Sequence, residues 1–236
     1  MCSITIRAAT YNIHGCVGSD GRYAPARVLK VIEALHADVI GLQEVDDRLP
    51  RHDGLQQFDF LLRGTGMHAV TGPNLHHERG GFGNALLSRW PITTVRRHNL
   101  SVLSYEPRGA LDVDLAADAG PLRVIVTHFG LRSSERCQQF SALLTAIAPL
   151  SDQPCVLMGD FNHWGPSRGS LLRSVTQQFP ASFAAPSYPS RWPILRLDRI
   201  FVRPRPISAS AEAVRSMPGR LASDHLPVIL DLTWAL

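Results

Sequence analysis

Polar residues of catalytic types follow short apolar runs at several points along this sequence. The clearest case is Gly159-Asp160-Phe161-Asn162, which comes directly after the apolar residues 155–158. Side chains two positions apart on a strand point to the same side. The segment therefore places one charged and one neutral oxygen donor at a predicted strand end, where they could hold a metal ion or a phosphate.

The same placement recurs at the ends of other apolar runs, at Asn12, Glu44, Arg108, His128, Asp198, Asp224 and His225. Hydrolysis of a phosphodiester needs a cation on the phosphoryl oxygens, an aligned water and a proton for the leaving oxygen. Mg²⁺ prefers oxygen ligands and keeps several waters, so one or two carboxylates suffice. Glu44 is the strongest candidate ligand, with Asn12 beside it. Asn12 could also be a turn residue before Gly15, and both roles could hold together.

Length and composition favour one domain over residues 1–236. Of the 236 residues, 44% are hydrophobic, and no linker or internal repeat divides the chain. No apolar run approaches the ~18–20 residues of a membrane span, and the sequence enters a predicted strand at once, so we expect no signal peptide. Four scattered cysteines without a CxxC spacing indicate free thiols in a reducing compartment. We therefore expect a cytoplasmic protein.

The positive charge of the chain comes almost entirely from arginine. The net charge is +4, and Lys30 is the only lysine. The guanidinium fork matches phosphate oxygens, although a preference for arginine can also reflect genome composition. No basic run marks a nucleic-acid-binding tail. The charge is compatible with an anionic substrate and does not demand DNA or RNA.

Strands are predicted to outnumber helices. Helical signals open at Pro25, lie within residues 55–62, follow a cap at Ser133 or Ser134, and recur near 171–175. Predicted strands cover 4–11, 38–45, 84–89, 110–115, 122–127, 155–158, 197–202, 207–214 and 226–232, with long loops at 72–83 and 179–195. Alternation in 110–115 predicts a half-exposed strand whose Asp112 and Asp114 face outward. This order favours a sandwich of two mixed sheets with helices outside.

Seven motifs together resemble the endonuclease/exonuclease/phosphatase superfamily and follow its order. They are YNIHG at 11–15, LQEV at 42–45, GNALLSR at 83–89, THF at 127–129, GDFN at 159–162, LDRIF at 197–201 and SDHLP at 223–227. Each motif alone is weak, but all seven in order are specific. The resemblance implies an α/β (α+β) protein with a four-layer α-β-β-α sandwich of the DNase I-like type. It also implies a phosphodiesterase or phosphomonoesterase that uses Mg²⁺, with Mn²⁺ as a substitute. Residues 106–109 and 192–199 are most similar to a small bacterial branch associated with cardiolipin synthase.

The resemblance implies roles for five catalytic residues. His128 would be a general acid or an oxyanion stabiliser, although a lone histidine beside a strand is often structural. Asp160 would orient or deprotonate the attacking water, and Asn162 would hold a phosphate oxygen. Asp198 would fix the tautomer of His225. His225 would then act as general base or contact the phosphate.

Further residues complete the implied site. They are Asn84, Arg108 and His14 for the substrate phosphate, and Asn12, Glu44 and Asp224 for the metal. Arg108 could instead be a surface arginine. His14 stands where the family's best-studied nucleases often carry an acid. The second-metal or water-network role of that acid is therefore not expected here, and His14 is expected to contact the phosphate instead. Asp224 is not a helix cap, because Pro227 and a predicted strand follow it.

The substrate is the least constrained part of the prediction. Trp192 and Ile194 lie in a loop just before Asp198, and Trp164 follows Asn162. They could form an apolar rim suited to a phospholipid, with the protein peripheral at a membrane, or they could fill the core. The favoured function is hydrolysis of a lipid or small-molecule phosphate ester by a monomer. The alternatives are a nuclease, which should carry basic or aromatic insertions along a nucleic-acid path, and an inactive phospho-ligand-binding relative, which should lack a catalytic residue.

Overall fold

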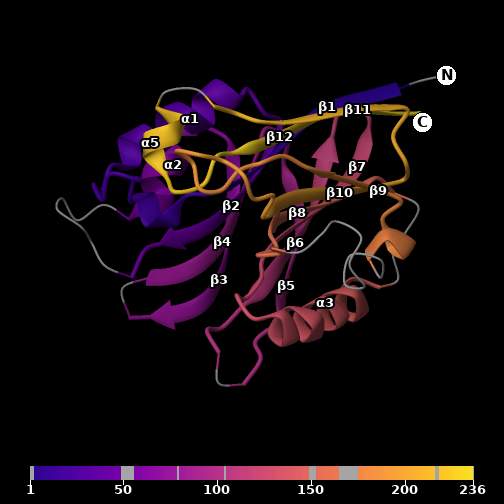
Figure 1. Cartoon of the computed structure of the whole chain (residues 1–236). Coiled ribbons are helices and arrows are strands. Elements are labelled where there is room, and N and C mark those ends of the chain that lie inside the picture. The colour runs from indigo at the N-terminus through magenta and orange to yellow at the C-terminus, as the bar shows by residue number, and fades with distance from the viewer. Residues whose placement is uncertain are drawn as a thin grey trace.

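Two six-stranded sheets face each other, with helices on their outer sides (Figure 1). The computed structural model describes residues 3–48, 56–78, 80–103, 105–148, 153–164, 175–215 and 218–235. This arrangement confirms the predicted sandwich of two mixed sheets. Among the described residues, no helix is long and apolar enough to cross a membrane.

The first sheet has the strand order β11-β12-β1-β2-β4-β3. Its strands are β1 (Ser3–Asn12), β2 (Val39–Asp46), β3 (His68–His77), β4 (Gly80–Ser88), β11 (Ser208–Ala213) and β12 (Val228–Ala235). Strands β1 and β2 are parallel, and the other described neighbours are antiparallel. The two ends of the chain lie side by side in this sheet, because Ser3 pairs with Ala235.

The second sheet has the strand order β5-β6-β7-β8-β10-β9. Its strands are β5 (Ile92–Asn99), β6 (Gly109–Ala117), β7 (Gly120–His128), β8 (Cys155–Asp160), β9 (Ala181–Ala184) and β10 (Asp198–Arg203). Here β7 and β8 are the parallel pair. In both sheets, antiparallel strands therefore begin at the end where the parallel strands finish.

Three apolar clusters hold the layers together. Side chains of one face of each sheet, including Ile6, Val126 and Ile200, meet between the sheets. Helices α1 (Pro25–Leu35), α2 (Gln57–Thr65) and α5 (Gly219–Ala222) lie on the first sheet, where a second cluster forms. Helix α3 (Ser133–Ile147) covers a third cluster on the second sheet. The strand alternation thus buries both faces of each sheet, as a four-layer sandwich requires.

The predicted loop at 72–83 is wrong, because most of it forms the hairpin of β3 and β4. Its glycines and proline suggest a loop, but β3 is an edge strand, where proline is tolerated. Pro73 lies at a shift in register between β3 and β4. The loop predicted at 179–195 contains the short edge strand β9, and β5 was not predicted.

Two smaller predictions also need correction. Asp112 is fully buried rather than outward-facing, because Arg96, Arg123 and His98 surround its carboxylate. Helix α3 begins after Arg132, and no serine side chain caps it by a hydrogen bond. Of the helix predicted near 171–175, residues 171–174 lie outside the described residues.

Candidate active site

Three of the expected catalytic residues are direct neighbours across the second sheet. His128 at the end of β7 pairs in register with Asp160 at the end of β8, and Asp160 pairs with Asp198 at the start of β10. Gly159 makes this pairing possible. Its φ is 155°, and a Cβ there would collide with the carbonyl oxygen of Thr127.

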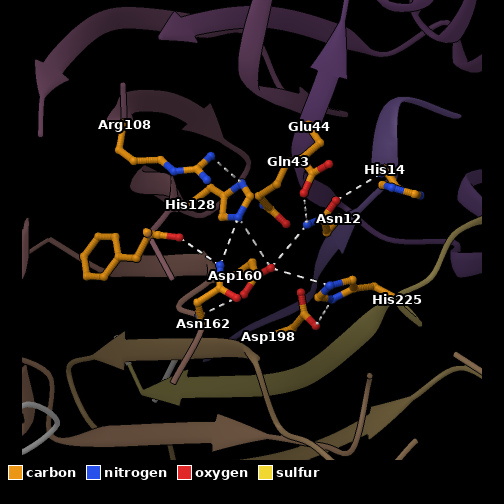
Figure 2. A network of polar contacts seen from close by, with 12 residues as sticks. Asn12, His14, Gln43, Glu44, Arg108, His128, Asp160, Asn162, Asp198 and His225 are labelled. Carbon is orange, nitrogen blue, oxygen red and sulfur yellow. Dashed lines mark hydrogen bonds and ion pairs between the residues drawn. The ribbon is translucent and has the colours of Figure 1, made fainter. Parts of the chain in front are cut away.

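Asp160 is the centre of the polar network (Figure 2). Asn12 donates to its Oδ2 at 3.2 Å, and the backbone N–H of Asn162 donates to its Oδ1 at 2.9 Å. The Nε2 atoms of His128 and His225 each lie 3.6 Å from Oδ2. Burial raises the pKa of Asp160 to about 6, although the charge of His225 and these hydrogen bonds act against it. The carboxyl group therefore exchanges its proton close to neutral pH.

His225, just before β12, is held by Asp198. Its Nδ1 lies 2.8 Å from Oδ2 of Asp198, and Ser187 donates to the same oxygen at 2.5 Å. The ring of Tyr188 lies against the imidazole, with 4.8 Å between ring centroids. Burial lowers the pKa of His225, but the carboxylates of Asp198 and Asp160 outweigh burial and raise it to about 10. Nδ1–H thus points at Asp198, which leaves Nε2 facing Asp160.

His128 has the opposite electrostatic character. It is 4% exposed, and its burial together with the charges of Arg108 and His225 holds its pKa well below the usual range. Arg108 Nη1 lies 3.3 Å from Nδ1. Because arginine can only donate, this contact uses Nδ1 of the neutral ring as the acceptor. The Nδ2 of Asn162, which donates to Phe129 O, lies 3.2 Å from Nε2 of the same ring. An amide nitrogen also only donates, and a neutral ring accepts at one nitrogen, so Arg108 and Asn162 compete for the two nitrogens of His128.

The first sheet contributes Asn12 and Glu44. Asn12 donates to Oε1 of Glu44 at 2.8 Å, and the backbone N–H of His14 donates to its Oδ1 at 3.0 Å. Glu44 has φ of 57°, at a shift in register between β2 and β4. Such a bulge redirects a side chain. His14 and Asn162 also have positive φ, each 48°, so backbone strain gathers around this site.

Some predicted site residues lie at its margin. Arg108 is buried and reaches the site through His128, so it is not the surface arginine of the alternative interpretation. Asp224 lies 3.8 Å from His14 Nδ1 and 3.3 Å from Oγ of Ser223, and among the described residues it forms no hydrogen bond or ion pair with Glu44. Asn84 donates to Gly109 O at 3.0 Å, and no group among the described residues donates to its own buried Oδ1.

Sequence reasoning missed two supporting serines. Ser187 binds Asp198, and Ser223 donates to the backbone oxygen of Asn12 at 2.7 Å while its Oγ accepts from the His225 N–H. Ser223 stands in a recognised motif and could have been found there. Ser187 lies in a loop, and no local signal marks it.

The oxygen donors of the site fit a divalent cation. The carboxylates of Glu44 and Asp160 both accept from Nδ2 of Asn12, whose Oδ1 accepts from the His14 N–H. Oδ1 of the buried Asp198 has no hydrogen-bond partner within the part of the chain that is described. Asp160, Asp198 and His225 also offer atoms within 4.8 Å of one another. The carboxylates of Glu44 and Asp160 suit Mg²⁺ better than the group that includes His225, because Mg²⁺ prefers oxygen and both nitrogens of His225 face carboxylates.

An aromatic rim borders the His225 side. Trp164 contacts Tyr188, with 6.3 Å between ring centroids. Trp192 and Ile194 are 80% and 75% exposed. The alternative that these two side chains fill the core is therefore wrong.

This fold and this site agree with a comparison against known families. Residues 9–225 match the model of the Endonuclease/Exonuclease/phosphatase family. The chain belongs to the endonuclease/exonuclease/phosphatase family. The similarity to a branch associated with cardiolipin synthase stays a prediction.

Individual relatives align along nearly the whole chain. The uncharacterized protein YbhP of Escherichia coli (strain K12) is 29% identical over 247 residues, covering 97% of this chain and 96% of YbhP. The endonuclease/exonuclease/phosphatase of Beutenbergia cavernae superposes with a TM-score of 0.78 at 25% identity, covering 98% of this chain and 72% of that one. A mannosyl-6-phosphatase of Bacteroides thetaiotaomicron superposes with a TM-score of 0.74 at 16% identity, covering 96% and 99%.

Proposed function

We propose that this protein is a Mg²⁺- or Mn²⁺-dependent hydrolase of phosphate esters, acting on a lipid or a small molecule by in-line attack of water. The observation that carries the proposal is the environment of Asp160. A buried carboxyl group with a pKa of about 6 lies between two histidines of opposite character. Such an arrangement suits proton transfer near neutral pH.

The roles of the residues follow from their protonation. Asp160 accepts the proton of the attacking water. His128 is neutral, and with Nδ1 accepting from Arg108 it would donate a hydrogen bond from Nε2 to a phosphoryl oxygen, which favours oxyanion stabilisation over general-acid catalysis for this residue. As the ester P–O bond breaks, protonated His225, which lies across Asp160 and contacts the phosphate, donates a proton to the leaving oxygen. The buried guanidinium of Arg108 would keep His128 in that donating tautomer.

Glu44 would hold the metal ion beside Asp160, and Asn12 would add its amide oxygen once its side-chain amide is turned. When bound there, a divalent cation supplies charge to stabilise the phosphoryl oxygens and to orient water. Asp224 lies close to His14 and is better placed at the margin of the site, where it positions His14.

The exposed rim supports an amphiphilic substrate. Trp192 and Ile194 project from the loop that also provides Ser187 and Tyr188. Exposed aromatic side chains with nearby arginine, here Arg191, suit the interface of an anionic membrane. We therefore include phospholipid vesicles among the substrates to be tested, and we propose a cytoplasmic protein that meets the membrane at this rim.

Catalysis is tested by turnover of bis-p-nitrophenyl phosphate with Mg²⁺ or Mn²⁺. His225→Ala and Glu44→Ala should each lower kcat by about 10²–10⁴-fold. His68→Ala and Glu33→Ala are matched controls, because both residues are exposed and lie outside the network. Full activity in both site variants would contradict the proposed site. A panel of DNA, RNA, phospholipid vesicles and sugar phosphates then separates the hydrolase of small or lipid esters from a nuclease.

A further inference from the structure

A pocket of about 440 Å³ opens beside Arg108, where β3 of the first sheet faces β5 and β6 of the second. Its walls come from residues 72–74, 97–99, Ser101 and 107–110. Its volume lies within the range of small-ligand sites, roughly 300–1,000 Å³. We propose that this pocket binds a compact hydroxylated group carried on the substrate's phosphate, such as a sugar, glycerol or another polyol. This inference rests on the proposed function.

The position of the pocket connects it to the catalytic network. Arg108 lines the pocket and also contacts His128, whose Nε2 faces Asp160. A phosphate held at His128 would therefore carry its organic group toward the pocket. A larger pocket of about 570 Å³ lies between β9 and β11 at the opposite edges of the sheets, and none of its lining residues belongs to the catalytic network.

The chemistry of the lining favours hydroxyl groups. Asn74 and Arg97 contribute an amide and a guanidinium, whereas the hydroxyl of Ser101 already bonds to the backbone of Arg108 at 3.2 and 3.3 Å. Hydroxyl groups both donate and accept, so a polyol matches this mixture. Among the described residues, the lining contains no Phe, Tyr or Trp on which a nucleobase would stack, and its one imidazole, that of His98, faces Asp112. Its aliphatic lining, Pro73, Pro107 and Ala110, is too small for an acyl chain.

Arg97 is held in place but not neutralised. Its Nε and Nη2 both donate to the backbone oxygen of Thr71, at 3.0 and 2.7 Å. No ion pair of Arg97 with an acid is found among the described residues. Arg108, in contrast, pairs with Glu106 at 2.8 Å. A guanidinium that is oriented by a backbone carbonyl and keeps its charge can bind an electron-rich oxygen of the ligand.

The experiment compares matched esters with and without hydroxyl groups in the full-length protein. Hexose 6-phosphate and glycerol 3-phosphate are compared with p-nitrophenyl phosphate, and phosphatidylglycerol vesicles with bis-p-nitrophenyl phosphate. The variants are Arg97→Ala, Arg97→Lys and Asn74→Leu, which replaces the carboxamide at similar size. Arg205→Ala is the control, because Arg205 is also exposed and also donates to a backbone carbonyl, that of Pro180.

We expect wild type to hydrolyse at least one hydroxylated ester. Arg97→Ala and Asn74→Leu should lower its kcat/KM, mainly through KM, at least about tenfold more than that of the matched p-nitrophenyl ester. Arg97→Lys should lose less, and Arg205→Ala should change neither value. If the two variants lose kcat/KM on hexose 6-phosphate or glycerol 3-phosphate, the substrate is a small molecule. If they lose it on phosphatidylglycerol vesicles, the pocket binds a lipid headgroup. Either result supports the proposed pocket.

The contrary outcomes separate the two proposals. Turnover of p-nitrophenyl esters without turnover of any hydroxylated ester overturns this inference alone. The inference also fails if Arg97→Ala and Asn74→Leu lower kcat/KM equally for the hydroxylated ester and for its matched p-nitrophenyl ester. If wild type hydrolyses no ester at all, the proposed function fails and this inference fails with it.

Discussion

Two aspartates buried in the same sheet have opposite surroundings. Asp112 on β6 and Asp160 on β8 are 0% and 1% exposed. Asp112 accepts from two arginines and a histidine, at 2.7 to 3.1 Å. Burial acts to raise its pKa, but Arg123, Arg96 and His98 outweigh burial and hold it well below the usual range. In the described part of the chain no arginine hydrogen-bonds to Asp160, and its pKa is raised to about 6.

The difference shows that burial alone does not mark a functional carboxylate. The charge of Asp112 is balanced by Arg96 and Arg123, so its carboxylate stays ionised without binding a proton or a further cation. Asp160 shares its site with the carboxylate of Asp198, and that charge raises its pKa further. A buried acid with too little positive charge around it is suited to bind a proton or a metal ion, which is the pattern of a catalytic group.

The largest effect expected is on the activity of Asp160→Asn. The amide keeps the shape but cannot accept a proton, so we expect kcat on bis-p-nitrophenyl phosphate to fall about 10²–10⁴-fold. Asp112→Asn should keep most of the kcat per folded molecule. Equal losses of kcat in the two variants would break the distinction between the two aspartates.

For the free energy of unfolding, the larger loss is expected in Asp112→Asn. Asp112→Asn leaves Arg96 and Arg123 without their buried partner, and breaking a buried ion pair typically costs about 3–5 kcal/mol. Urea unfolding at pH 7 measures this loss. Asp231→Asn is the control, because the Arg7–Asp231 pair is partly exposed and such pairs contribute only about 0–1 kcal/mol. Similar costs for the two variants would show that the Asp112 cluster is not specially stabilising.

The two aspartates also show what the sequence can reveal. Asp160 was predicted as a site residue because it directly follows a buried run, which is a local signal. The burial of Asp112 depends on Arg123 and Arg96, which reach it across neighbouring strands. Alternation within residues 110–115 carries no information about those neighbours, so the residue was predicted to face outward.

The same limit applies within the site. Asn12, His128 and Asp198 lie at strand ends that hydrophobic runs reveal. The bulge that turns Glu44 into the site depends on how β2 pairs with β4, and the contact of Ser187 with Asp198 depends on the path of a long loop. Both are tertiary features that no spacing in the sequence indicates.

A third effect is the stabilisation of the folded protein by the metal ion that we propose beside Asp160. Asp112, which is paired with Arg96 and Arg123, should not contribute to it. Mg²⁺ or Mn²⁺ should stabilise wild type, by about 2.7 kcal/mol at a hundredfold excess over Kd, and thermal unfolding with and without the ion measures this. Glu44→Gln and Asp160→Asn should lose most of the stabilisation. Glu33→Gln and Asp112→Asn should keep it, and an equal shift in all four variants would mean that the ion binds elsewhere.

The smallest effect is a difference in pH dependence, measured by urea unfolding of metal-free protein. The folded pKa of Asp112 is lowered, so its contribution is present above the unfolded pKa, about 3.9, and is lost as the pH falls through the folded pKa. The gap between wild type and Asp112→Asn should therefore shrink, on the order of 1 kcal/mol, between pH 5 and pH 3.

Asp160 should show the opposite sign. Its folded pKa of about 6 lies above the unfolded one, so ionisation opposes folding, fully above pH 6 and not at all below about pH 4. Asp160→Asn should therefore be more stable than wild type at pH 7, and this advantage should vanish as the pH falls to 4. If both replacements gave stability differences that change with pH in the same direction, the two carboxylates would be in equivalent surroundings, and the assignment of Asp160 as the proton acceptor would lose its physical basis.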